Sequence, residues 1–448
     1  MEKIMEYLNF EDIKGIERFK SGPHKALART LEDLYGATVR LVFNPIETFK
    51  SRWGIDITEN PKRESYRIDG YEDMVLLVIY VENADTMYYL GIQLNSPLVS
   101  YYDTAVIHST CINIGRKLTE ASEKDFRSCL SLFNETLAKE IVIGYFGRGS
   151  YDISKVAYLV DLFMGLRSTT FEGKYFSTGL ILTKSLFAFS KAEKFDKRGK
   201  FVRLAKGKLN VDLTDRQNTR FWYLVDGFNT FYLTDLKKTI NSVFLYDGID
   251  NDYVSEMVLN KTLQGADALF RVSNGRELSI IDSGGIEFIH QEKAWKYRDY
   301  EALKKCILNR MPHVAGFYDT LIKYVLDCSK SDTSSIIWFP RDIDKIDEII
   351  LTDSKKTFSY RLLDFKDENV RPIIKRLLSS DGATVIDADG KIRFFGCFAD
   401  ISKAKAGGIK GTGETAASLL AQNGLAIKIS QDGPIKIFME GMEGYIPF

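Results

Sequence analysis

The stretch from Ser380 to Phe398 constrains the fold of this chain more than any other. It reads SDGATVIDADGKIRFFGCF, in which two runs of β-branched and aromatic residues flank an Asp-Gly pair. Such a pair is a strong signal for the turn of a β-hairpin. A glycine-bearing loop follows, and then GTGETAASLLAQNG predicts a helix that opens on a glycine turn. We therefore expect a carboxylate, Asp381, and a helix N-terminus to lie in one region at a sheet edge.

Helical and strand patterns alternate along the chain and predict an α/β protein. We expect three domains: an α/β domain over residues 1–150, a strand-rich domain over 151–300, and a mixed sheet surrounded by helices over 301–448. In the middle domain we expect short strands, among them Phe221–Leu224, and exposed turns across the lysine-rich stretch Ser190–Leu209. The first two domains carry no motif that we can interpret, and their aromatic, strand-rich character fits a sensor or a scaffold.

The composition of the chain excludes several classes of protein. Of 448 residues, 45% are hydrophobic and 27% are charged, which is typical of a packed globular protein. Lys+Arg and Asp+Glu are both 61, so there is no strongly basic footprint and a nucleic-acid partner is not expected. No apolar run reaches the ~18–20 residues of a membrane span, and no signal peptide is apparent, so we expect a cytoplasmic protein without a membrane partner. The five Cys and four His show no spacing typical of a zinc site.

Asp381 is the first residue with a candidate chemical role. It stands next to Gly382 and Ala383, and glycine lets a ligand or another backbone approach closely. A carboxylate in this position can bind Mg²⁺ or Mn²⁺, or orient a ribose hydroxyl. The alternative is that the Asp-Gly pair is only a turn. The nearby acidic pair, Asp387 and Asp389, flanks the expected hairpin tip and is interpreted as solvated turn residues.

The loop before the C-terminal helix is the second candidate. Lys410, Gly411, Thr412 and Gly413 supply a cation, flexible backbone and N–H donors at a helix start, a composition that favours a phosphate cradle. Thr412 is the expected N-cap. The alternative is an ordinary glycine-rich loop before a capped helix, and the sequence is not a Walker A loop because no Gly-Lys-Ser/Thr follows. Gly144–Gly149 (GYFGRG) matches the glycine spacing of a dinucleotide site only loosely and is set aside.

The order of these blocks resembles the diadenylate cyclase domain. SSIIWF, a helix, DGATVID, FFGCFADI, GTGETAA and LAIKIS-QDG-PIKIF follow one another here. Such a domain typically reads DGA, then AGC, then GTRHRAA, then SEE and TG before its last strand. The resemblance covers roughly residues 315–440. It implies that two ATP molecules are condensed into a cyclic dinucleotide with release of pyrophosphate, between two domains placed face to face, and hence that the protein self-associates through its C-terminal domain.

The resemblance also implies roles for individual residues. The DGA aspartate, here Asp381, serves the metal and the reacting ribose hydroxyl. The GTRHRAA block, here Gly411 to Ala417, holds the triphosphate. The acidic SEE turn keeps one carboxylate, Asp432, as a further metal ligand. The nucleotide-binding residues implied in this way are Gly382, Ala383, Gly396, Cys397, Phe398, Lys410, Gly411, Thr412, Gly413 and Thr415.

The chain departs from this pattern where the family has Arg-His-Arg, because Gly413, Glu414 and Thr415 stand there. Phosphoryl transfer depends on stabilising the charge spread over phosphate oxygens, so losing such groups costs on the order of 10²–10⁵ in rate. Two sources of compensation are open. Glu414 is one, as a catalytic group that binds the metal. The other is the set of lysines in the preceding loop, Lys403, Lys405 and Lys410.

Three functional hypotheses follow from these residues. The first is an enzyme that uses Mg²⁺ or Mn²⁺ to make a cyclic dinucleotide from ATP. The second is a binding module that holds ATP or a cyclic dinucleotide without turnover. The third is an interaction protein whose cyclase-like fold has lost its ligand. The retained Asp381, Gly411, Thr412, Ala416 and Ala417 favour the first.

Overall fold

The computed structural model describes most of the chain. The described residues are 23–42, 45–60, 62–83, 86–123, 135–148, 151–186, 189, 199–203, 211–212, 219–235, 239–240, 242–246, 263, 265–273, 277–331, 333–357, 362–403, 411–442 and 444–448. Helices and mixed sheets occur throughout, so the expected α/β class is confirmed.

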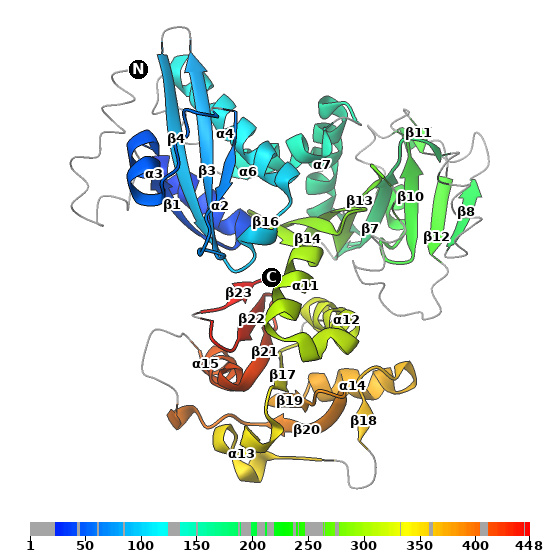
Figure 1. Ribbon diagram of the computed structural model, residues 1–448. Helices are drawn as coiled ribbons and strands as arrows, with labels where there is room; N and C mark the ends of the chain where they lie inside the picture. The colour runs from blue at the N-terminus through cyan, green and yellow to red at the C-terminus, as the bar shows by residue number, and fades with distance from the viewer. Residues whose placement is uncertain are drawn as a thin grey trace. The chain divides into compact units, whose positions relative to one another are not determined.

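The chain forms two compact units, Met1–Tyr300 and Glu301–Phe448 (Figure 1). The boundary between them coincides with the start of the third domain expected from the sequence. The further division of the first unit at residue 150 stays a prediction.

The first unit begins with a four-stranded antiparallel sheet in the order β1-β4-β3-β2. Its strands are β1 (Thr38–Val42), β2 (Ser65–Arg67), β3 (Met74–Asn83) and β4 (Thr86–Asn95). Residues Met74 to Ile79 of β3 are all buried. Alternate residues of this run enter a core cluster with Phe49 of α3 (Pro45–Trp53), and α4 (Thr104–Glu123) lies against the same strand. A strand covered on both faces accounts for an apolar run without alternation.

The second sheet of this unit has eight strands in the order β16-β15-β14-β13-β7-β10-β12-β8. Only β7 and β10 are parallel neighbours within it. Its strands are β7 (Thr178–Leu182), β8 (Gly199–Arg203), β10 (Thr230–Thr234), β12 (Ser242–Tyr246), β13 (Ala268–Ser273), β14 (Glu277–Asp282), β15 (Ile286–Gln291) and β16 (Ala294–Asp299). Short pairs are formed by β5 (Thr170–Phe171) with β6 (Lys174–Tyr175), and by β9 (Val211–Asp212) with β11 (Thr239–Ile240).

Helix α2 (Pro23–Tyr35) lies against both β1 and β16, so it contacts the two larger sheets of the first unit. At its end Tyr35 packs against the Tyr297 ring, with centroids 5.7 Å apart, and its carbonyl accepts a hydrogen bond from the Tyr102 hydroxyl at 2.7 Å. Two further helices, α6 (Glu135–Phe146) and α7 (Ile153–Arg167), pack against each other, and α6 also contacts α4.

Two local predictions in this unit are wrong. Phe221–Leu224 lies mostly in a short helix, α9 (Thr219–Tyr223), instead of a strand. The Phe221 ring stacks on Tyr232 at 4.1 Å, and its carbonyl accepts a hydrogen bond from the Tyr232 hydroxyl, so tertiary contacts decide the conformation of these aromatic residues. The stretch Ser190–Leu209, expected to be turns, contains strand β8, while residues 190–198 and 204–209 lie outside the described part.

The second unit contains a seven-stranded mixed sheet in the order β18-β20-β19-β17-β21-β22-β23. Its only parallel pair is β17 with β19. The strands are β17 (Ser335–Pro340), β18 (Leu363–Asp364), β19 (Ala383–Ile386), β20 (Lys391–Cys397), β21 (Gly424–Ile429), β22 (Ile435–Met439) and β23 (Ile446–Pro447). The helices are α11 (Tyr300–Arg310), α12 (Tyr318–Lys330), α13 (Ile346–Ile349), α14 (Arg371–Leu378) and α15 (Thr412–Leu420). Short 3₁₀ turns are η2 in the first unit (Val99–Tyr101) and η4 to η9 here (Pro312–Phe317, Ile343–Lys345, Thr352–Ser354, Glu368–Val370, Ile401–Lys403, Ala421–Asn423).

Helices cover both faces of this sheet (Figure 1). Trp338 of β17 lies in a core cluster with Leu420 of α15, whereas its neighbour Phe339 stacks on Phe317 just before α12. Alternate residues of a strand point to opposite faces, so α15 and α12 cover different sides. All six residues of β17 are buried, as expected for a central strand between two helical layers.

Candidate functional site

Asp381 lies directly before β19, where the chain comes out of α14. Its side chain is exposed, and Oδ1 accepts a hydrogen bond from the backbone N–H of Gly382 at 3.0 Å. Gly382 has φ of +91°, and a Cβ there would lie 2.7 Å from the carbonyl carbon of Gly396. Only glycine lets β19 start this close to β20, so Gly382 fixes the position of the carboxylate.

Strand β20 supplies the opposite side of this close contact. Gly396 is buried with φ of +62°, and the Lys356 side chain lies over it, with Nζ 3.9 Å from where a Cβ would stand. Cys397 is buried and pairs with Ala383, and burial raises the pKa of its thiol to about 11. Phe398 is 46% exposed. An ammonium group therefore lies beside the strand start that carries Asp381, and the sequence analysis did not identify Lys356.

The register of the sheet aligns one residue from each of five neighbouring strands. Cys397 of β20 pairs with Ala383 of β19, which pairs with Ile336 of β17. Ile336 pairs with Lys428 of β21, and Lys428 with Lys436 of β22. Residues opposite one another on neighbouring strands present their side chains on the same face. Both lysines therefore lie on the face that holds the core cluster shared by Cys397, Ala383, Ile336 and helix α15.

Helix α15 begins at Thr412 on this face. Its N-cap is Gly411, with φ of +98° and no side-chain hydrogen bond, so the prediction that Thr412 is the N-cap is wrong. The first bond back to the cap comes from Thr415, whose backbone N–H and hydroxyl both donate to the Gly411 carbonyl at 3.1 Å. The N–H groups of the first turn have no acceptor within the helix, and the helix dipole favours an anion there.

Lys428 lies against the first turn of α15. A Cβ on Gly413 would come within 2.8 Å of Lys428 Cε, so the missing side chain makes room for the lysine. Lys428 Nζ donates hydrogen bonds to Ser334 Oγ and to the Ile429 carbonyl, both at 2.7 Å. Burial lowers the pKa of Lys428, although the carboxylates of Asp432 and Glu414 oppose that shift. A partly desolvated ammonium group thus lies next to a helix start whose N-cap, Gly411, makes no side-chain hydrogen bond.

Lys436 completes the cationic side of the site. It donates a hydrogen bond to Glu414, and its ammonium group lies 4.6 Å from the centre of the Tyr445 ring. Burial favours a lower pKa for Lys436, but the hydrogen bond to Glu414 and the Tyr445 interaction outweigh it and raise the pKa above its usual value. Glu414 is therefore engaged in an ion pair, and its role as a catalytic group stays a prediction.

The two carboxylates expected to bind metal lie at different strands. Asp432 is exposed in the turn between β21 and β22, where Gly433 N–H donates to the Ser430 carbonyl. Strand β17 separates β21 from β19, so the turn and Asp381 are offset by two strand spacings, roughly 10 Å. Among the described residues, no group of three or more His, Cys, Asp and Glu could hold a metal ion. The roles of Asp381 and Asp432 toward Mg²⁺ or Mn²⁺ remain predictions.

Of the three lysines expected to replace the missing cations, the described residues include only Lys403. Lys403 pairs with Asp400 at 3.2 Å and donates to the Glu348 carbonyl at 2.9 Å. Lys405 and Lys410 lie outside the described residues, so the structure does not place them. Among the described residues, the cations beside the helix start are Lys428 and Lys436, which sequence reasoning missed. The signal available was a single lysine in each strand of the last hairpin, LAIKIS and PIKIF.

Comparisons with known proteins do not identify the chain. No family model matches it, and no curated protein matches it. One solved structure found to be similar is a hypothetical membrane spanning protein from Bacillus cereus, with 15% identity over 33% of this chain and 75% of that chain, and a TM-score of 0.25. A likeness at this level does not establish a shared fold. Within the described part of this chain, no helix combines the length and the apolar character needed to cross a membrane.

Proposed function

We propose that the unit Glu301–Phe448 binds ATP and condenses two ATP molecules into a cyclic dinucleotide with release of pyrophosphate. The observation that carries this proposal is the row of paired residues across five strands. It ends on one side near Asp381 and on the other at Lys428 and Lys436, beside the start of α15. A carboxylate, ammonium groups and the N–H donors of a helix start are groups that bind a nucleoside triphosphate.

Each part of the site has a role in this proposal. The N–H donors of Thr412, Gly413 and Glu414 bind phosphate oxygens, and Lys428 and Lys436 offset their charge in place of the Arg-His-Arg of the resembling family. Asp381 orients the attacking ribose hydroxyl and would hold Mg²⁺ or Mn²⁺, which supplies positive charge at the phosphates when bound. Each P–O bond that forms to a ribose oxygen replaces the P–O bond to the departing pyrophosphate. One unit offers one such site, so the reaction requires a self-associated pair.

A second candidate function is nucleotide binding without turnover. The observation in its favour is the ion pair between Glu414 and Lys436, in which a carboxylate neutralises one of the two cations at the helix start. A site weakened in this way retains enough donors to hold ATP or a cyclic dinucleotide. The same residues would then report a nucleotide to a partner domain.

Product analysis separates these functions. The purified full-length protein, incubated with ATP and either Mg²⁺ or Mn²⁺, should yield a cyclic dinucleotide detected by mass spectrometry. Asp381→Asn should abolish product but keep ATP binding, because the change removes charge and little shape. Asp389→Asn is the matched control at the exposed hairpin tip and should behave as wild type. ATP binding without product in the wild type would favour the binding module, and product from Asp381→Asn at wild-type rate would remove Asp381 from the mechanism.

Lys428→Met tests the cationic side separately. Calorimetry should show a loss of ATP affinity of about tenfold or more, because one charge-assisted hydrogen bond contributes about that much to binding. The affinity for adenosine should be unchanged. Equal losses for ATP and adenosine would show that Lys428 does not face the phosphates.

A further inference from the structure

A cavity of about 560 Å³ opens within the first unit, among helices α4, α6 and α7. This volume falls within the range of small-molecule sites, roughly 300–1,000 Å³. The lining residues recur at helical spacing on one face of each helix, so one face of each of the three helices lines the space. The cavity belongs to a different unit from the proposed nucleotide site.

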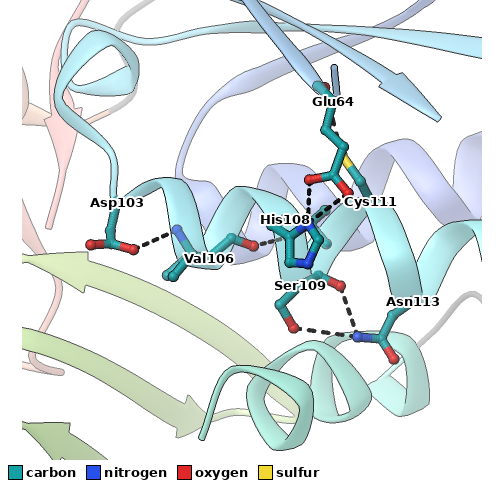
Figure 2. Close-up of polar contacts among 9 residues, drawn as sticks. Glu64, Asp103, Val106, His108, Ser109, Cys111 and Asn113 are labelled. Carbon is teal, nitrogen blue, oxygen red and sulfur yellow. Dashed lines mark hydrogen bonds and ion pairs between the residues drawn. The ribbon is translucent and has the colours of Figure 1, made fainter. Parts of the chain in front are cut away.

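The floor of the cavity is built by hydrogen bonds and close contacts between α4 and α6. Ser109 Oγ donates to the Ile141 carbonyl at 2.8 Å. Asn113 Nδ2 donates to the Ser109 carbonyl, also at 2.8 Å (Figure 2). A Cβ on Gly144 would lie 2.7 Å from Ser109 Oγ. A Cβ on Gly147 would lie 2.6 Å from Ile153 Cγ1 of α7. These two glycines of the GYFGRG stretch therefore let the helices approach each other closely. The floor is formed by contacts within the protein.

The cationic groups of the lining are unequally compensated. Arg116 pairs with Glu140 at 2.9 Å, and Lys139 pairs with Asp161 of α7. Arg148 has a buried Nη2 atom with no hydrogen-bond partner among the described residues. A buried N–H donor without an acceptor is unfavourable, which makes this atom the expected contact for a ligand oxygen.

His108 lines another side of the cavity and is held by the carboxylate of Glu64, which lies behind it. His108 Nδ1 lies 2.6 Å from Glu64 Oε1, and Figure 2 shows the imidazole turned toward this carboxylate. Nε2 is then the ring nitrogen that can contact a ligand. Burial raises the pKa of Glu64, while Arg148 opposes that shift. The remaining surface is apolar and includes Ile112, which is 50% exposed, and Ile153, which is 57% exposed.

We propose that this cavity binds a small organic carboxylate, with the carboxylate on Arg148 and the apolar body against Ile112, Ile143 and Ile153. A guanidinium binds a carboxylate through paired N–H groups. The carboxylates of Glu64 and Asp103 act on Arg148 electrostatically, but its buried Nη2 atom makes no hydrogen bond within the described residues. A phosphate dianion requires a second cation, whereas Lys139 is paired with Asp161 and Arg116 shares Glu140 with Lys117. Large apolar side chains exposed at the cavity rim suit the body of such a ligand.

The test compares an acid with its neutral amide on the full-length protein. The probes are 4-phenylbutyrate and 4-phenylbutyramide, which share the same apolar body, with phenyl phosphate as the phosphate arm. We expect 4-phenylbutyrate to bind at least about tenfold tighter than the amide. Equal affinity for acid and amide, tighter binding of phenyl phosphate, or no binding of any probe would overturn the proposal.

Three variants test which residue causes the tighter binding of the acid. Arg148→Met should remove the difference between acid and amide, and Ala157→Leu, which fills the lining on α7, should weaken both probes. Arg220→Met, at an exposed arginine of α9 in the same unit, is the matched control and should keep the full preference. An acid preference that survives in Arg148→Met would overturn the assignment. Should Arg148→Met fail to fold, as thermal unfolding shows, the wild-type preference and the Ala157→Leu loss still decide the proposal.

Discussion

Gly424 begins β21 in a backbone conformation that leaves no space for a side chain. Its φ is +122°, and a Cβ would stand 2.2 Å from the Phe339 carbonyl oxygen and 2.8 Å from the Arg341 nitrogen. Both neighbours are backbone atoms of the adjacent strand region, so they cannot move without breaking the sheet. This residue therefore sets the junction between α15 and the hairpin that carries both lysines.

We predict that Gly424→Ala lowers the free energy of unfolding by about 3 kcal/mol or more, from backbone strain plus a steric clash. The control is Gly411→Ala, which also has a positive φ, +98°, but has nothing within 4 Å of the new Cβ. That variant should lose only the stability that corresponds to the backbone strain, about 1–2 kcal/mol. Guanidinium denaturation measures both, and equal losses would show that the contact at Gly424 relaxes.

Cys397 provides a second prediction at this scale. Its side chain is 1% exposed and its pKa is raised to about 11, so at pH 8 roughly one thiol in a thousand is ionised. Iodoacetamide should leave Cys397 unmodified in the native protein and modify it fully after denaturation, as peptide mapping would show. Rapid native modification would mean that β20 opens, and it would remove Cys397 from the ordered part of the nucleotide site.

Single residues of the site were predictable only where local sequence carried the signal. Asp381 and Gly382 stand in a short motif next to a strand start, so the sequence could single them out as candidates, and their roles stay predictions. Lys428 and Lys436 are eight positions apart and meet only through the register of β21 and β22. Lys356 reaches Gly396 through a loop contact that no periodic pattern encodes. Cross-strand partners depend on tertiary register, and this is why they were missed.

At the scale of elements, α12 and α14 are joined by a buried ion pair. Arg371 Nη2 lies 2.8 Å from Asp327 Oδ2, and both side chains are almost fully buried. Burial raises the pKa of Asp327, while the hydrogen bond from Arg371 and the charge of Lys375 oppose the shift. Such a pair holds two helices in one relative position, because removing Arg371 leaves the buried carboxylate of Asp327 with only the more distant charge of Lys375, 3.6 Å away, among the ion pairs that it forms with described residues.

We predict that Arg371→Met lowers the free energy of unfolding by about 3–5 kcal/mol at neutral pH. Without the guanidinium, the pKa of Asp327 in the folded state rises further, whereas its pKa in the unfolded state keeps the ordinary carboxyl value. The folded state then binds the extra proton, so stability falls as pH rises above the ordinary carboxyl pKa and through the raised one. Denaturation should therefore show a smaller loss at pH 5 than at pH 8, and a loss independent of pH would contradict this account. The double variant Asp327→Leu, Arg371→Met should recover part of the loss.

Prediction at this scale succeeded where hydrophobic pattern and turn chemistry agreed. The strands on either side of Asp389-Gly390 form β19 and β20, and the last hairpin forms β21 and β22. The segment Phe221–Leu224 failed because aromatic residues favour strands in general, whereas the Tyr232 contacts hold this one as a helical turn. Its short length left no periodicity with which to distinguish the two.

At the scale of the whole molecule, the second unit has what an independent domain requires. It has its own seven-stranded sheet, a core cluster built from residues of that sheet and of α15, and helices on both faces. At about 150 residues it is long enough to bury most of the surface that its unfolded chain exposes. Strand β17, its central element, pairs only with strands of the same unit.

We predict that a fragment from Asp299 to Phe448, which keeps all of α11, folds on its own and unfolds in one cooperative thermal transition. Circular dichroism should show mixed helix and strand content, and Arg371→Met should lower its melting temperature as it does in the full chain. Under the proposed function, ATP with Mg²⁺ should raise the melting temperature of the fragment, because a ligand that binds only the native state stabilises it. By contrast, 4-phenylbutyrate should have no effect, since its cavity lies in the first unit. A fragment without a cooperative transition would show that the two units depend on each other for folding. A folded fragment whose melting temperature does not change with ATP would contradict the proposed nucleotide site and leave the prediction of independent folding intact.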